Sequence, residues 1–200
     1  GFSANQRVLN FILKPNFNAL TADLELGGSL EGGGFQTELD TNYLNMVDGR
    51  RFSLDGEIET QEMIREVDRG LANADQPGTR SLTPASQEAA FTAVYNLPPS
   101  EDLRITATAD LILSETKRLN GFPELEFTLP AANPFSTSTD DETFTRFFGV
   151  RGALRDDSDT VDADLTVTVL KEFTNWRWTT NAQIGREVTN RDTDREPDAS

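Results

Sequence analysis

The chain has 200 residues, of which 34 are acidic and 18 basic, so its formal net charge at pH 7 is −16. This charge argues against binding to nucleic acid or docking on an anionic lipid surface, because both need clustered Lys and Arg. The hydrophobic fraction of 36% is low for a soluble globular protein, so we expect long loops or an interior that is not dry.

Cysteine and histidine are both absent from the sequence. Their absence excludes a disulfide framework, a thiolate metal site and a Ser-His-Asp catalytic set. No apolar run reaches the ~20 residues of a membrane-spanning helix, which excludes a helical membrane protein. We therefore predict that the protein is not an enzyme and uses no cofactor.

The N-terminal segment, residues 1–15, differs from the sequence that follows it. It contains the stretch VLNFILK, which is apolar on both sides of Asn10 and ends at Lys14-Pro15. The chain opens on Gly1 with neither an initiator methionine nor a signal peptide. We expect it to be mature, trimmed or a piece of something longer.

Seven segments alternate apolar and polar side chains with a period of two, which is typical of half-exposed β-strands. We predict strands at residues 16–28, 34–47, 50–64, 87–97, 102–115, 159–170 and 175–188. In the fifth segment, Leu103, Ile105 and Ala107 lie on one face, whereas Arg104 and Thr106 lie on the other. Alternation alone leaves open whether the apolar face meets a second sheet or lipid.

The connections between these segments are alternately long and short. Short turns fall at Asp48-Gly49, Pro98–Asp102 and Lys171–Thr174, and long connections follow Gly27 and span 65–86 and 116–158. All short turns therefore lie on one edge of the sheet. Outer-membrane barrels sort their connections in this way, whereas compact soluble domains seldom carry such long loops. We predict an all-β, antiparallel up-and-down meander that forms part of a transmembrane β-barrel, with long extracellular loops and short periplasmic turns.

Aromatic residues on the apolar phase support this interpretation. Five of them lie within a few residues of a short turn: Tyr43, Phe52, Tyr95, Trp176 and Trp178. The general preference of aromatics for strands explains their presence but not their shared end, so we interpret them as a periplasmic aromatic girdle. Glu62 and Arg186 would continue the apolar phases, but we expect both at the long-loop end, where a charge costs little.

The polar phase is strongly acidic. We predict that it faces a water-filled or plugged lumen, through Asp23, Glu25, Glu38, Asp40, Asp55, Glu57, Glu59, Arg104, Asp110, Asp162, Asp164 and Arg177. Two interpretations stay open: water solvates the acids, with Arg104 and Arg177 as partners, or the acids form a path for cationic or metal-chelate solutes.

No metal or phosphate site is predicted. The acidic run that starts at Arg155, RDDSDTVDAD, lacks the Gly at position six and the Glu at position twelve of an EF-hand calcium loop. The glycines at 32–34 lack the strand-to-helix context and the Lys of a phosphate-binding loop.

The N-terminal stretch resembles the end of the plug domain of TonB-dependent outer-membrane receptors. Val8, Asn10, Ile12 and Lys14, with the apolar residues between them, match in order a Val/Ile-rich stretch that leads into the first barrel strand of that family. The resemblance implies that residues 1–15 end a plug domain and residues 16–200 begin the barrel. The family has 22 barrel strands and a TonB-contacting plug, so it also implies that the chain is a fragment.

The same resemblance implies a function. Receptors of this family lie in the outer membrane of Gram-negative bacteria and take up a scarce solute, of the siderophore, vitamin or carbohydrate type. TonB, driven by the inner-membrane proton gradient, pulls on the plug. The expected partners are therefore outer-membrane lipid, the TonB complex through the missing plug region, and a small solute of unknown identity. Two alternatives stay open: a passive porin or other barrel, and a soluble acidic β-domain that binds carbohydrate or calcium.

Overall fold

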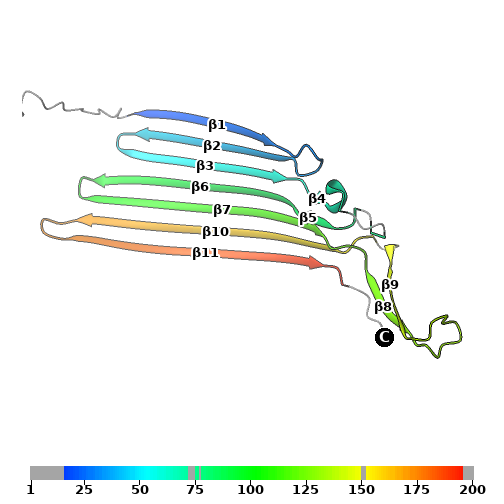
Figure 1. Ribbon diagram of the computed structural model, residues 1–200. Helices are drawn as coiled ribbons and strands as arrows, with labels where there is room; N and C mark the ends of the chain where they lie inside the picture. The colour runs from blue at the N-terminus through cyan, green and yellow to red at the C-terminus, as the bar shows by residue number, and fades with distance from the viewer. Residues whose placement is uncertain (1–15, 72–74, 77, 150–151, 196–200) are drawn as a thin grey trace, which may run out of the picture.

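Seven strands form one antiparallel sheet in the computed structural model, which describes residues 16–71, 75–76, 78–149 and 152–195 (Figure 1). Neighbours in the sheet follow one another in this order: β1 (Phe17–Gly27), β2 (Gln36–Val47), β3 (Arg50–Gln61), β6 (Ala85–Ser100), β7 (Leu103–Leu119), β10 (Arg155–Glu172) and β11 (Arg177–Thr193). The predicted all-β antiparallel meander is confirmed. The motif at Val8–Lys14 lies outside the described residues.

The three short turns lie at one end of the sheet and the three long connections at the other, as Figure 1 shows. The β2–β3 turn is built by Asp48 and Gly49, whose φ angles of 49° and 78° are the left-handed values that a two-residue hairpin turn requires. The asparagine Asn16 fixes this turn, since its Oδ1 accepts a hydrogen bond from the Asp48 amide at 3.2 Å.

The long connections contain short elements that the periodicity of the sequence does not predict. The segment between β3 and β6 carries a small sheet of β4 (Ile64–Arg65) and β5 (Ser81–Thr83) and the 3-10 helix η1 (Glu66–Arg69). The segment between β7 and β10 carries a hairpin of β8 (Glu124–Leu129) and β9 (Glu142–Phe147). Phe127 and Phe144 stack across that hairpin with ring centroids 5.6 Å apart. Both pieces are too short for a periodicity to reveal.

Strands β7, β10 and β11 extend beyond their predicted ends at the long-connection edge. Lys117 lies opposite Asp157, and Asp156 lies opposite Thr193, so the ladder continues where the sequence shows charges on both phases. Cross-strand polar pairs hold this extension in place of apolar alternation. Strand β3, in contrast, ends at Gln61, which leaves Glu62 outside the strand.

The sheet has no hydrophobic core of its own. None of the described hydrophobic residues is buried, and the accessible surface of 15,080 Å² far exceeds the ~9,300 Å² expected for a compact protein of this mass. Both faces of the sheet are open along most of their length. Among the described residues, no helix is long and apolar enough to cross a membrane. β1 and β11 are the two edge strands.

Candidate functional site

The strand register places the apolar phases of all seven strands on one face of the sheet. We call this the apolar face and the opposite one the acidic face, and we call residues that lie opposite one another across neighbouring strands a row. One row of the apolar face, for example, contains only aliphatic side chains: Leu24, Leu39, Ile58, Ala89, Leu113, Val161 and Val188. The sheet therefore exposes a continuous apolar surface.

The short-turn border of the apolar band crosses the strands obliquely. The row of Tyr43 begins at Leu20 in β1 and ends at Ile184 in β11. In β1 the apolar phase runs from Leu20 toward the long connections as far as Leu26, whereas in β11 it runs from Ile184 toward the short turns as far as Trp178. The short-turn border of the band thus shifts along the strands from one edge of the sheet to the other, whereas on the long-connection side Leu24 and Val188 still share one row.

The angle of this shift can be estimated from the register. Trp178 lies six residues beyond the row of Tyr43, which is ~20 Å along the strand. Five inter-strand steps separate β2 from β11, which is ~24 Å across the sheet. The aromatic line from Tyr43 to Trp178 therefore makes an angle of about 40° with the rows, within the 35–45° strand tilt of outer-membrane barrels.

The expectation that Arg186 lies at the long-connection end of its strand is wrong. This residue does not lie at the end of its strand, because β11 continues to Thr193. It shares a row with Ala22 and Leu111, which are inside the apolar run of their own strands. On β11 Arg186 therefore interrupts the apolar phase between Ile184 and Val188.

The five predicted girdle residues lie along the short-turn side of the apolar band, with one correction. Tyr43 and Phe52 are neighbours, with ring centroids 6.2 Å apart, and Tyr95 lies opposite Phe52. Trp176 lies before β11, in the turn, and its ring stacks on Phe173 at 3.8 Å. Phe173 is a further aromatic residue at this border that was not predicted, although its position inside a short turn is visible in the sequence.

The acidic face concentrates its carboxylates in three consecutive rows without any Lys or Arg. The first row contains Glu25, Glu38, Glu59 and Glu88; the next contains Asp23, Asp40, Glu57, Asp162 and Glu187; the third contains Asp55, Asp110 and Asp164. All ten acidic residues predicted on the polar phase lie here. The structure places them on one face, and their facing a lumen stays a prediction.

Neutral polar groups bind several of these carboxylates. Asn42 donates a hydrogen bond to Asp55, and Thr92 Oγ1 donates to Asp110 Oδ1 at 2.7 Å. The closest approach to a metal-ligand set in the described part of the chain is Glu38, Asp40 and Glu57, with one oxygen of each within 4.8 Å of the others. These three carboxylates are open to solvent.

Arg104 and Arg177 lie on the acidic face but do not partner its carboxylate rows. Arg104 is six residues from Asp110 along β7, about 20 Å away. Arg177 instead forms an ion pair with Glu172, with 2.7 Å between Nη2 and Oε1. The hypothesis that these arginines balance the acids is therefore wrong, because both lie at the short-turn end of the sheet.

The short-turn end is fastened by a cross-strand ion pair. Lys171, near the end of β10, binds Asp102 in the β6–β7 turn, and Ser100 Oγ donates to the same carboxylate at 2.5 Å. The hydrogen bonds from Lys171 and then Ser100 lower the pKa of Asp102 to about 2. The turn therefore stays anionic and paired throughout the physiological range of pH.

At the opposite end, a bidentate ion pair joins the extensions of β10 and β11. Arg191 donates from Nε to Asp156 Oδ1 at 2.7 Å and from Nη2 to Oδ2 at 2.5 Å, and Thr193 adds a third donor. The hydrogen bonds from Arg191, and then from Thr193, lower the pKa of Asp156 to about 2.

Replacing Arg191 by Gln should raise the pKa of Asp156 toward its ordinary value near 4. Because the folded pKa is lowered, this pair stabilises the extension above the unfolded pKa of ~3.9 and ceases to do so as the pH falls through about 2. Carbon-detected NMR titration of the Asp156 carboxyl measures the shift. An unchanged pKa in the Gln variant would contradict the pairing.

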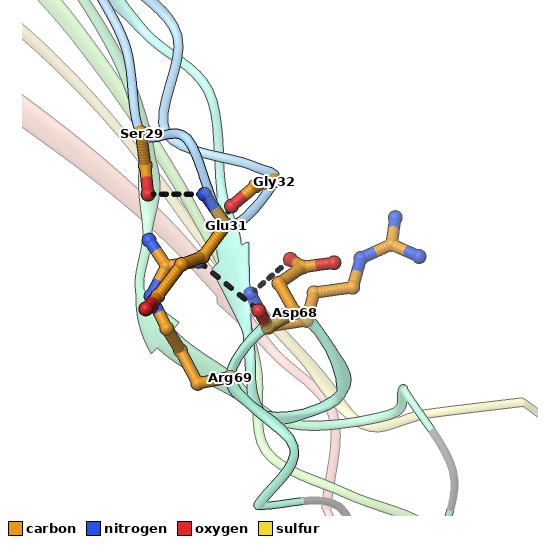
Figure 2. Close-up of polar contacts among 6 residues, drawn as sticks. Ser29, Glu31, Gly32, Asp68 and Arg69 are labelled. Atoms are coloured by element: carbon orange, nitrogen blue, oxygen red, sulfur yellow. Dashed lines mark hydrogen bonds and ion pairs between the residues drawn. The ribbon is translucent and has the colours of Figure 1, made fainter.

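The glycine-rich connection between β1 and β2 is clasped by helix η1 (Figure 2). Arg69 Nη1 donates to the carbonyl of Gly32 at 2.6 Å, and its Nε lies 3.7 Å from Glu31. Gly33 has a φ of +65°, and a Cβ there would lie 2.8 Å from Asp68 Oδ2, so only glycine fits against η1. The clasp fixes η1 above the end of the sheet.

No protein-family model matches this sequence, and neither the curated proteins nor the solved structures contain a match to it.

Proposed function

We propose that this chain forms part of the wall of an outer-membrane β-barrel, and specifically of a TonB-dependent receptor that takes up a scarce solute. The observation that carries the membrane part of this proposal is the oblique aromatic border of the apolar face, from Tyr43 to Trp178. A membrane plane must cross the tilted strands of a barrel obliquely, and the angle of about 40° lies within the strand tilt of such barrels.

The length of the apolar run on β7 fits a bilayer. The apolar phase of β7 runs from Leu103 to Leu113, which is ~33 Å along the strand. At a tilt of ~40° this length spans ~25 Å along the membrane normal, the height of the apolar band of outer-membrane barrels. Beyond Leu113 the same face becomes charged, with Glu115 opposite Asp159.

The acidic face then lines the interior, where water and a plug can solvate its carboxylates. The edge strands β1 and β11 would pair with further strands, since hydrocarbon does not tolerate unpaired backbone groups. The uptake function and the dependence on TonB rest on the resemblance of Val8–Lys14 to the end of a plug domain. A passive porin would share the wall but not this motif.

Cysteine labelling in intact cells tests the orientation directly, because the chain has no cysteine of its own. The complete protein encoded by the gene, with any cysteine outside this chain replaced by serine, would carry a single cysteine at Ser138, Thr166 or Val167. A membrane-impermeant maleimide should label Ser138, in the β8–β9 connection, from outside the cell. Thr166 should react through the aqueous lumen and Val167 should not; equal labelling of the last two would overturn the membrane proposal.

Energy dependence separates the receptor from the porin. Uptake of a panel of labelled siderophores, vitamins and oligosaccharides would be compared in cells with and without the gene, with TonB present or deleted, and with a proton uncoupler. Uptake that requires the gene, TonB and the proton gradient supports the receptor. Gene-dependent uptake that persists without TonB would replace it with the porin.

A further inference from the structure

A groove on the apolar face is formed by one small residue between two large ones. Ala89 of β6 lies between Ile58 of β3 and Leu113 of β7 in a single row. The resulting groove has a volume of about 340 Å³ and continues to Val161 of β10. It lies at the last apolar row before the charged extension of the sheet.

A polar cleft adjoins this groove on the side of the long connections. Its volume is about 570 Å³, and Thr60, Gln87 and Glu115 line both cavities. Arg65 and Asp68 line the cleft from η1 and the residue before it, which the clasp of Arg69 on Gly32 holds above the sheet.

The lining of the cleft suits a neutral, hydroxyl-rich group. Thr37 and Thr60 supply hydroxyls and Gln87 an amide. The Glu115 carboxylate is paired with Lys117, and Asp68 Oδ2 accepts a hydrogen bond from the Arg65 amide at 2.8 Å. These two acids are therefore partly satisfied. With Glu62, which also lines the cleft, three acids face Arg65 and Lys117, so the cleft offers donors and acceptors with a formal net charge of only −1.

We infer that the groove and the cleft together bind one glycolipid of the outer leaflet, with an acyl chain over Ala89 and its sugar head group beneath η1. An apolar channel that opens into a polar cleft at the membrane boundary matches an acylated sugar, since the chain and the head group need these two environments side by side. The inference rests on the proposed function, because it requires the apolar face to meet lipid.

Filling the groove tests the inference. Ala89→Trp would be compared with Ala93→Trp, four residues along the same strand, on the same face and outside both cavities. Each full-length protein, purified in detergent, would be titrated with lipid A, with dephosphorylated lipid A and with phosphatidylethanolamine, and bound lipid counted by native mass spectrometry. Ala89→Trp should weaken lipid A binding about tenfold or more, and Ala93→Trp less than about twofold.

A second pair of variants probes the head group without adding bulk. Thr60→Val in the cleft should weaken lipid A binding, and Thr108→Val on the acidic face should not. Equal binding of lipid A and dephosphorylated lipid A assigns the contacts to the sugar, whereas a loss on dephosphorylation assigns them to phosphate at Arg65 and Lys117. Equal binding of phosphatidylethanolamine, or equal losses in the Trp variants, would overturn the inference. Cysteine labelling at Val167 separately reports any failure of the membrane proposal.

Discussion

Replacing Ala107 by arginine is expected to prevent most of the protein from assembling in the outer membrane. Ala107 lies near the middle of the apolar run of β7, in a row with Tyr95 and Val167. An arginine near the bilayer midplane of a barrel costs about 2–4 kcal/mol. Since the total stability of a domain is only about 5–15 kcal/mol, this is a large fraction of it.

The matched control is the neighbouring residue. Thr106→Arg places the same charge on the acidic face, where water accommodates it, so assembly should remain close to that of the unmodified protein. Urea titration of each variant folded into lipid vesicles gives the difference in unfolding free energy, and outer-membrane fractionation gives the yield in cells. Equal stability of the two variants would refute the assignment of the apolar face to lipid.

The sequence alone predicted the strands and the sorting of their connections, because both are local properties. In β7 and β10 each side chain from Leu103 to Leu113 and from Val161 to Val169 reports its own face through the period of two. The extensions escaped prediction because they are held by pairs such as Asp156 and Arg191, which lie 35 residues apart in the sequence.

The oblique band could not be derived from single strands. Each strand shows an apolar run of its own, but only the register states that Leu20 and Ile184 share a row. Register depends on the backbone geometry of every turn and connection between β1 and β11, including β6–β7, whose pairing is irregular between Leu97 and Ser100. The same dependence hid the groove over Ala89, whose walls come from two other strands.

The face on which each carboxylate lies could be predicted from its own strand, but its neighbours across the sheet could not. The sequence assigned the carboxylates to one phase, and the register gathered them into three adjacent rows. The basic residues Arg104 and Arg177 lie away from these rows, near the short turns. Like charges directly opposite one another destabilise a sheet in isolation, so the acidic rows need water, counter-ions or a cationic surface beside them.

Arginine substitutions within a single row are expected to lower the unfolding free energy by unequal amounts at the two edges of the sheet. One row contains Asn18 on β1 and Ala182 on β11, and the oblique band leaves Asn18 outside and Ala182 inside. Ala182→Arg should therefore cost about 2–4 kcal/mol, and Asn18→Arg about 0–1 kcal/mol. A band parallel to the rows would give both variants the same cost.

In a second row, the larger loss of stability should occur on β1 and not on β11. Ala22 on β1 lies inside the band, and its row-mate on β11 is the native Arg186. We expect Ala22→Arg to lower stability by about 2–4 kcal/mol, whereas Arg186→Ala changes it by less than about 1 kcal/mol. Urea unfolding of all four variants in the same vesicles checks both rows together. The crossed pattern is the one that a membrane plane across tilted strands predicts. Matched losses within each row would therefore remove the membrane plane from this face.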